Sequence, residues 1–371
     1  MYITEDKLVR KQNNFDLLRL LAALFVFISH TYAITSTGTK DLLYQLSGGR
    51  YLFSTAGLII FFSMSGFLVC RSLLTSSSLK QYFLKRFLRI WPAYFVCILF
   101  CIFFIGTLFT TLPVTGFFVH PDTVRFFIKN STLLSSHLVL PGVFNNSSVN
   151  ASAWTIPVEV RLYILLGLLF LFTKSNFRRW APVILLIGWL LQIIIPLSVQ
   201  YQYLKPHLVS AVYLGLYFLA GVCFYQYKNK LPLKFQVWVL LFCLWFISLR
   251  WFPQTLSITE LPFFLYSLFW VSVGWKKIPF WRADISYGFY LFSYPIQKAI
   301  HTTMGQYLNF IEFFVLTGVS TTCLALLSWY FIEKKALKYK TTALNRLSLA
   351  GAYFSKKPED KANSYKQDSQ D

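Results

Sequence analysis

The stretch FDLLRLLAALFVFISH, residues 15–30, decides the fold class of this chain. It is apolar enough to begin a membrane helix, yet it carries Asp16, Arg19 and His30. Arg19 and His30 are eleven residues apart, which in a helix places them on one face and separates them by about 16 Å along the axis. Asp16 precedes Arg19 by three residues, close enough to pair with it and to lower the cost of the charge.

Each of these residues also has a purely structural interpretation. Arg19 could extend its charge to the membrane surface, and His30 could be an ordinary interfacial histidine. Three such residues on one helix favour a functional role instead. We expect Arg19 near the cytoplasmic boundary of the membrane and His30 nearer the outer one.

The composition of the whole chain agrees with this beginning. Of its 371 residues, 56% are hydrophobic and 13% are charged, which is typical of a polytopic membrane protein. Runs long enough to cross a bilayer, about 20 residues each, recur along most of the chain. They predict an all-α membrane bundle of about ten transmembrane helices, over residues 15–35, 52–74, 92–111, 154–173, 180–199, 208–227, 233–250, 257–274, 284–303 and 311–333.

The basic residues set the orientation of this bundle. If the N-terminus is cytoplasmic, 26 of the 35 lysines and arginines fall on cytoplasmic segments. This bias predicts that both termini are cytoplasmic. The formal charge of +21 is therefore a topology signal spread over loops and tail, and it does not indicate binding to nucleic acid.

The pattern predicts one membrane domain, residues 1–340, followed by a polar tail, residues 341–371, that is expected to be a disordered cytoplasmic segment. The six cysteines lie in or at the ends of apolar runs without the spacing of a metal site or a disulfide framework. We interpret them as packed thiols and expect no metal cofactor.

A basic segment follows the second predicted span. SLKQYFLKRFLRIWPAY, residues 78–94, interleaves aromatic and basic residues and predicts an amphipathic helix at the cytoplasmic interface, with the next span beginning at Pro92. Its Arg86 and Arg89, together with Arg71, suit a phosphorylated ligand, because arginine binds phosphate through two parallel hydrogen bonds. Anchoring to anionic lipid is the alternative, and charge alone slightly favours it.

Two further groups of residues lie inside predicted spans. SAWTIPVEVRLY, residues 152–163, places Glu159 and Arg161 within the fourth apolar run, where they need partners. Glu159 lies at a depth comparable with His30, so it could orient or charge-stabilise the imidazole, and a structural ion pair with Arg161 or another arginine is the alternative. In the second span Ser63, Ser65 and Gly66 are small residues that favour close helix packing.

Several of these motifs resemble the acyltransferase-3 family of integral membrane O-acyltransferases. FDLLRLLAALFVFISH is similar to the family's first helix, with its Arg-x10-His pair at Arg19 and His30. FFSMSGFLV, residues 61–69, resembles the FF-x-x-SGFL segment, and KRFLRIWPAY carries the Arg-x-x-Arg pair as Arg86 and Arg89. SAWTIPVEVRLY is similar to the W-S-L-x-V-E stretch, with Thr155 in place of the usual serine.

The C-terminal part continues the resemblance. ISYGFYLFSYPI, residues 285–296, resembles the late ISYxLYLWHWP motif, and SWYFIEKK resembles the closing stretch that ends at Glu333. The late motif commonly has a histidine where this chain has Ser293, so His30 must act without that second imidazole.

The resemblance implies an acetyl-CoA-dependent O-acetyltransferase of the bacterial inner membrane. It would take an acyl group, most often acetyl, from cytoplasmic acyl-CoA to a hydroxyl of a cell-surface glycan, such as lipopolysaccharide. Arg86, Arg89 and Arg71 would hold the donor's phosphates, with Arg19 deeper in the path and paired with Asp16. His30 would be a general base or a transient acyl acceptor, supported by Glu159.

A transporter or flippase of a lipid-linked glycan is the alternative function. The same buried charges could line a substrate or proton path across a bundle. The chain has no evident inverted repeat, and the series of motifs favours the enzyme. Residues 112–152, the longest outer connection, are the segment expected to face the acceptor, with a short interfacial helix within it. They carry no motif that selects one glycan.

Overall fold

A computed structural model describes residues 2–8, 12–35, 40–195, 205–279 and 283–339. The predicted polar tail, residues 341–371, lies outside the described residues. Over the described ranges the chain is all-helical, and pairing between extended segments is confined to one isolated bridge, Val139 with Ser148. The prediction of an all-α bundle is confirmed.

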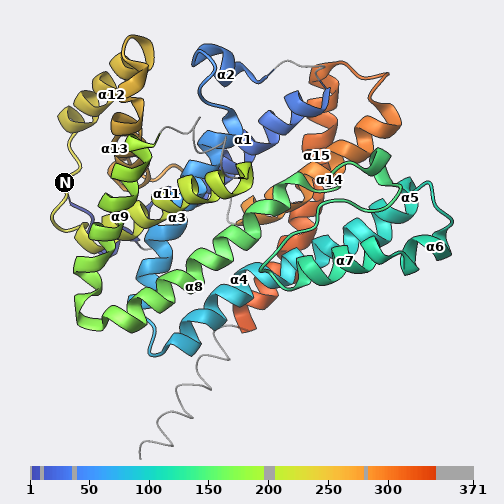
Figure 1. The fold of residues 1–371 in the computed structure, drawn as a ribbon, viewed down its shortest axis with the longest axis horizontal. Coiled ribbons are helices and arrows are strands. Elements are labelled where there is room, and N and C mark those ends of the chain that lie inside the picture. The colour runs from blue at the N-terminus through green and yellow to red at the C-terminus, as the bar shows by residue number, and fades with distance from the viewer. Residues whose placement is uncertain (1, 9–11, 36–39, 196–204, 280–282, 340–371) are drawn as a thin grey trace, which may run out of the picture.

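The helices follow the predicted apolar runs closely (Figure 1). The longer ones are α1 (Phe15–Thr35), α3 (Phe53–Leu74), α4 (Leu79–Phe100), α8 (Thr155–Thr173), α9 (Phe177–Ile194), α11 (Pro206–Tyr227), α12 (Phe235–Arg250), α13 (Leu256–Phe269), α14 (Ser286–Met304) and α15 (Phe310–Ser328). The shorter ones are α2 (Leu42–Leu46), α5 (Thr107–Phe109), α6 (Val114–Val119) and α7 (Pro121–Ser131). Further short helical turns are η1 (Asp6–Leu8), η3 (Cys101–Gly106), η4 (Val143–Asn146), η5 (Ala151–Trp154), η6 (Lys174–Asn176), η7 (Pro253–Thr255), η8 (Trp270–Gly274) and η9 (Trp329–Glu333).

Eight helical segments in the described part of the chain are long and apolar enough to cross a membrane, so the count of ten is not reached on these criteria. The two remaining predicted spans also form helices. One of them, α12, has only 16 residues, and the other, α14, has 19 residues and includes several polar side chains. Both helices pack within the bundle, α12 against α13 and α14 against α1 and α15.

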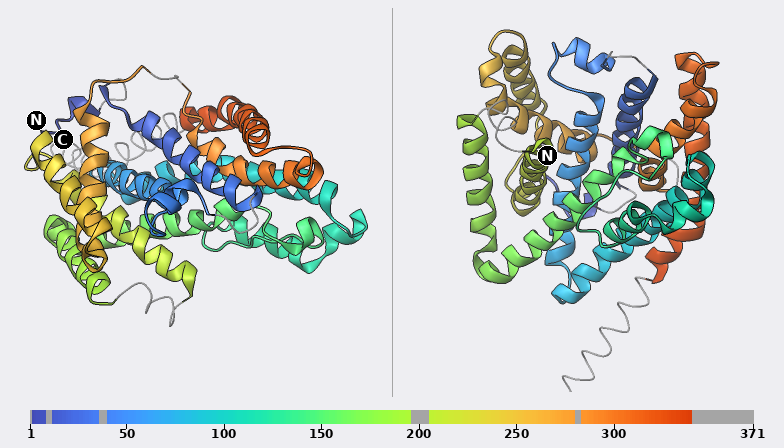
Figure 2. Two further views of the ribbon diagram at one scale, coloured as in Figure 1. Left: turned by 90° about the horizontal axis from the view of Figure 1, so that it is seen from above. Right: turned by 45° about the vertical axis from the view of Figure 1, so that its right-hand side comes forward.

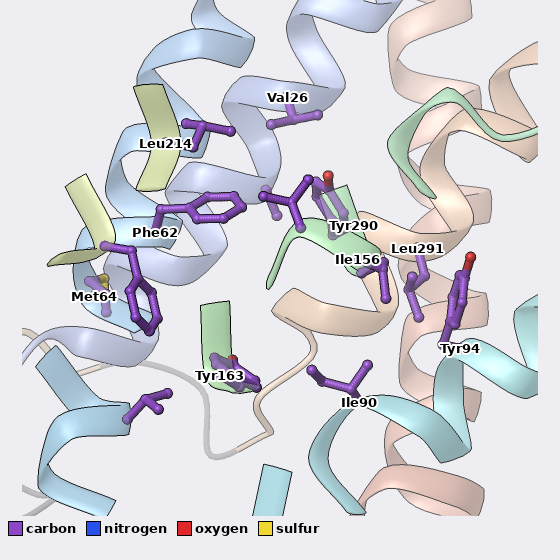
Figure 3. Packing of buried hydrophobic residues seen from close by; sticks show 14 of the residues in the cluster. Val26, Phe62, Met64, Ile90, Tyr94, Ile156, Tyr163, Leu214, Tyr290 and Leu291 are labelled. Atoms are coloured by element: carbon purple, nitrogen blue, oxygen red, sulfur yellow. The ribbon is translucent and has the colours of Figure 1, made fainter. Parts of the chain in front are cut away.

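The bundle is built around α3, which packs against α1 on one side and α11 on the other. Gly66 of α3 and Gly221 of α11 allow this contact, because an added Cβ at either would overlap a backbone carbonyl oxygen of the opposite helix. Figure 3 shows buried side chains of α1, α3, α4, α8, α11 and α14 gathered in the centre. These six helices contribute much of the lining of the cavities described below.

One helix boundary differs from the prediction. Pro92 lies inside α4, which begins at Leu79 after its N-cap Ser78 and continues through η3 to Phe109 as one helical segment of 31 residues. The amphipathic segment and the following span are therefore one continuous helix. The segment continues past the proline because Tyr82 and Ile90 before it and Tyr94 after it are all buried against the same core.

The connection over residues 112–152 does not form a simple outer loop. Its helix α7 packs along α4, where the Tyr94 hydroxyl donates to Asn130 Oδ1 at 3.1 Å and the Trp91 indole N–H donates to the Ser131 carbonyl at 3.4 Å. The expected short helix is thus present. The α5–α6 segment lies at the opposite end of the long axis from the N-terminus (Figure 2).

The cysteine prediction is only partly correct. All six thiols are free, and Cys70, Cys97 and Cys101 are buried as expected. Cys243 and Cys323 are exposed on the outer surface of their helices, so they are not packed thiols. Their helices lie at the edge of the bundle, where an apolar surface suits contact with lipid.

Candidate functional site

Three adjoining cavities follow one another through the bundle. The basic cavity, about 860 Å³, is lined by Asp16, Arg19, Arg86, Arg89 and Asp284 among others. The central cavity, about 800 Å³, shares the three arginines with it and adds Ser65, Glu159 and Tyr163. The histidine cavity, about 1300 Å³, contains His30 and shares Leu58 and Tyr290 with the central cavity.

Taken in order, these cavities extend from one end of the bundle toward the other, and neighbouring cavities share lining residues. The basic cavity lies where α1 begins, and we call that side the basic end. The histidine cavity lies toward the end of α1, beside the starts of α3, α8, α11 and α13, and we call that side the histidine end. The stripe predicted on α1 therefore faces the cavities at both of its ends, through Arg19 and His30.

Arg19 and Arg89 share one carboxylate at the basic end. Asp284, just before α14, lies 2.8 Å from Arg89 and 3.6 Å from Arg19, and it is 7% exposed. Asp16 also pairs with Arg19, at 3.5 Å, as its position three residues earlier predicted. Ser286 donates to Asp284 at 2.7 Å. Asp284 was not identified from the sequence, although it is an acidic residue directly before the late family motif.

Arg86 is the cation at this end with the fewest protein partners. It donates a long hydrogen bond of 3.4 Å to Ser72 and lies over the Tyr163 ring at 6.0 Å. Among the described residues no carboxylate lies within ion-pair distance of it, and its Nε has no acceptor. Because Arg86 lines both the basic and the central cavity, its charge faces the space that a ligand would fill.

Arg71 is turned away from these cavities. Its guanidinium pairs with Glu5 at 3.1 Å and donates to the Leu8 carbonyl at 3.1 Å, so it holds the N-terminal segment. Glu5 also pairs with Lys228 at 3.1 Å. Partial burial alone would raise the pKa of the Glu5 carboxyl, but Lys228 and Arg71 hold that pKa below its usual value. The structure thus separates Arg71 from Arg86 and Arg89.

Glu159 faces the central cavity, and Arg161 does not pair with it. The Ser65 hydroxyl donates to Glu159 Oε1 at 3.0 Å, and the Tyr163 hydroxyl donates to the same oxygen. Arg161 is exposed, and its guanidinium donates to the Leu134 carbonyl at 2.7 Å. A carboxylate, a serine and a tyrosine therefore meet midway between the two ends (Figure 3 labels Tyr163).

His30 has few interactions in the histidine cavity. Its ring packs edge-on against Tyr294, with ring centroids 5.0 Å apart and planes at 83°. Within the described ranges its buried Nδ1 has no hydrogen-bond partner. The structure does not bring Glu159 against His30, since the two line different cavities. The His30 residue lines the cavity, and no carboxylate among the described residues pairs with its imidazole.

Glu260 is a buried carboxylate at the histidine end. It is 6% exposed, and it accepts hydrogen bonds from Tyr51 at 2.9 Å and Gln192 at 3.3 Å. It lines the same cavity as His30. Sequence reasoning missed it, although it is the one acidic residue in the apolar run LSITELPFFLYSLF, residues 256–269.

The C-terminal motif residues are buried. Ser293, where the family often has histidine, is 1% exposed and donates to the Tyr290 carbonyl of its own helix at 3.2 Å. Glu333 is 3% exposed and accepts from Ser328 at 3.0 Å. Within the described ranges no group of histidine, cysteine, aspartate and glutamate side chains is arranged to hold a metal ion.

Comparisons with known proteins agree with the motifs. The model of a family described as an acyltransferase domain, acyltransferase-3, matches residues 12–330. An O-acetyl transferase of Shigella phage Sf6 is 29% identical over 355 residues, covering 91% of this chain and 99% of that protein. Nodulation protein 10 of Rhizobium leguminosarum bv. viciae is also 29% identical, over 370 residues, covering 91% of this chain and 97% of that protein. No solved structure matches the chain.

Proposed function

Since this chain belongs to the acyltransferase-3 family, we propose that it moves an acetyl group from cytoplasmic acetyl-CoA to a hydroxyl of a cell-surface glycan. The observation that carries the proposal is the line of three cavities, with arginines at one end and the His30 imidazole at the other. The O-acetyl transferase named among the relatives supports the reaction class. We place the protein in the bacterial inner membrane with the basic end cytoplasmic, as the loop charges favour.

The donor would bind at the basic end. Its phosphates would lie against Arg86 first, because that side chain has no carboxylate partner among the described residues. Arg89 and Arg19 would contribute positive potential while Asp284 and Asp16 hold them in place. The long flexible arm of the donor would then pass through the central cavity, so that the thioester approaches the histidine end.

His30 would act on the acceptor in one of two ways. As a general base it takes the proton of the sugar hydroxyl while the oxygen attacks the thioester carbonyl. The carbon–sulfur bond then breaks, and the CoA thiolate leaves and takes up a proton. As a transient acyl acceptor, the imidazole attacks the thioester itself, and the sugar hydroxyl then displaces it from the acyl group. Both routes convert acetyl-CoA and an alcohol into an O-acetyl ester and CoA.

Glu159 would serve the transfer from the central cavity. Its carboxylate fixes the hydroxyls of Ser65 and Tyr163, which line the passage between donor and histidine. Because their hydrogens are donated to the carboxylate, these hydroxyls would accept hydrogen bonds from the amide N–H groups of the donor's arm. We therefore propose that Glu159 supports His30 through the position of the donor and through its negative charge, without direct contact.

The activity can be tested with membranes from cells that express the protein and from matched cells that do not. Acetyl-CoA labelled in the acetyl group is supplied, and the surface glycan is isolated and treated with mild alkali to release ester-linked label. The proposal expects alkali-labile label only when the protein is present. If no label reaches any glycan, while a lipid-linked glycan crosses the membrane in a protein-dependent way, the transporter alternative replaces the enzyme.

A further inference from the structure

The residues that line the histidine cavity together with His30 have the composition of a ligand site. Glu260 of α13 is the buried acid there, and its carboxylate accepts from Tyr51 and Gln192. An ionised carboxylate can accept about four hydrogen bonds. The Glu260 carboxylate can therefore accept further hydrogen bonds from a ligand in the cavity, which is also lined by His30.

The other lining residues indicate what kind of ligand fits. Trp154 and Tyr213 bring aromatic rings, Ser54 brings a hydroxyl, and the exposed Arg50 lies before the start of α3. A sugar residue offers apolar ring faces to aromatic side chains and hydroxyl edges to polar ones. A buried carboxylate accepts from hydroxyls but repels a phosphate or a carboxylate on a ligand. The site therefore suits a hydroxyl-rich sugar.

We propose that the histidine cavity is the acceptor subsite and that Glu260 positions the sugar, so that one hydroxyl lies at His30. The inference rests on the proposed function and adds the class of acceptor and the residue that selects it. Glu260 acts as a positioning residue, since it holds the hydroxyls that do not react. The connection over residues 112–152, expected to face the acceptor, contributes only Ser152 to this cavity among the described residues.

The substitution Glu260→Gln tests this role. It keeps the size of the side chain and one carbonyl oxygen, but it removes the charge that strengthens hydrogen bonds from sugar hydroxyls. The loss of one charge-assisted hydrogen bond predicts a rise of about tenfold in the acceptor KM, with an unchanged acetyl-CoA KM. The label should also spread over more than one sugar hydroxyl, because the acceptor is held less firmly.

The matched control is Glu312→Gln. Glu312 lies at the start of α15 in a capping box with Asn309, is exposed, and lines none of the three cavities. Glutamine is also accepted in a capping box, so this variant should keep both KM values. Tyr51→Phe provides a second probe if Glu260→Gln fails to fold, since it removes one donor to the carboxylate and should change the acceptor KM alone.

The assay uses the full-length protein in lipid nanodiscs with labelled acetyl-CoA. The acceptor probe is the surface polysaccharide of the expressing strain after mild alkali has removed its ester groups. Both KM values are measured, and the acetylated position is read by NMR. If Glu260→Gln keeps the acceptor KM and the acetylated position of the wild type, the proposed subsite is overturned. It is also overturned if the donor KM and the acceptor KM rise equally while the thermal midpoint falls, because that result indicates a structural role.

Binding of the same polysaccharide without donor separates this proposal from the proposed function. If wild-type protein binds the polysaccharide and Glu260→Gln binds it about tenfold more weakly, the subsite is supported even when no acetyl is transferred. In that case only the transfer activity is contradicted. If wild-type protein transfers acetyl but Glu260→Gln binds the polysaccharide equally well, the subsite is wrong and the activity stands.

Discussion

Arg86 gives the sharpest prediction about the donor. It lines both the basic and the central cavity, and it has one long hydrogen bond, 3.4 Å to Ser72, in place of an ion pair. A hydrogen bond to a charged group contributes about 1.5–3 kcal/mol, which corresponds to roughly a 10- to 100-fold change in affinity. Because Arg86 is only partly buried, we expect the lower end for Arg86→Ala, about a tenfold rise in the donor KM.

Arg86→Lys refines the same prediction. Lysine keeps the charge but lacks the planar fork that binds two phosphate oxygens, so it should restore part of the donor affinity. Arg71→Ala is the matched control, because Arg71 pairs with Glu5 and lines none of the three cavities. Its donor KM should equal that of the wild type. Arg89→Ala should raise the donor KM together with a loss of stability, since it leaves Asp284 with one arginine fewer.

The assay measures CoA release from acetyl-CoA with a thiol-reactive dye, at saturating de-esterified polysaccharide and varied donor. Thermal midpoints of the purified variants in detergent show whether each one is folded. The reasoning is refuted if folded Arg86→Ala has the donor KM of the wild type. It is also refuted if Arg71→Ala raises the donor KM as much as Arg86→Ala. General positive charge at the membrane surface would then explain donor binding without a specific contact of Arg86.

Two further predictions concern the framework of the site. Asp284→Asn leaves two guanidinium groups without their shared buried carboxylate, and it should destabilise the protein by about 3 kcal/mol. The measurement is the thermal midpoint in detergent, which should fall. An unchanged midpoint would show that these ion pairs contribute nothing to stability. Gly66→Ala should sharply reduce the yield of monodisperse protein in size-exclusion chromatography, because the new methyl group overlaps the backbone of α11. Gly116→Ala, which meets no atom within 4 Å, is its control, and equal yields of the two variants would refute the close contact.

The sequence predicted the helices well because, in an apolar surrounding, the backbone N–H and C=O groups of each segment must form their hydrogen bonds within that segment. Hydrophobic runs therefore marked α1, α3 and α8 almost to the residue. The continuous α4 was less predictable, because Pro92 usually begins a helix and here lies inside one. The path of residues 112–152 depends on contacts with α4 such as that of Asn130 with Tyr94, which periodicity does not encode.

The sequence identified several residues of the candidate site, but it did not predict which residues they contact. The spacing of Asp16, Arg19 and His30 on one helix placed them toward opposite ends of the cavities. Partners contributed by distant segments were missed, namely Asp284 for the arginines and Glu260 beside the histidine cavity. Both are acids whose partners lie on other helices, so only tertiary packing reveals what they face. Lone acids within or beside apolar runs were the available signal.

His30 tests the central claim most directly. Wild-type protein, His30→Ala and His301→Ala, the last a histidine of α14 that lines none of the three cavities, are purified and compared at matched thermal stability. The measurement is transfer of labelled acetyl from acetyl-CoA to de-esterified surface polysaccharide, read as alkali-labile label. The account predicts that His30→Ala loses transfer by at least about 100-fold, as expected for the loss of a general base or acyl acceptor, while His301→Ala keeps it. Folded His30→Ala that transfers acetyl as fast as the wild type would contradict the account.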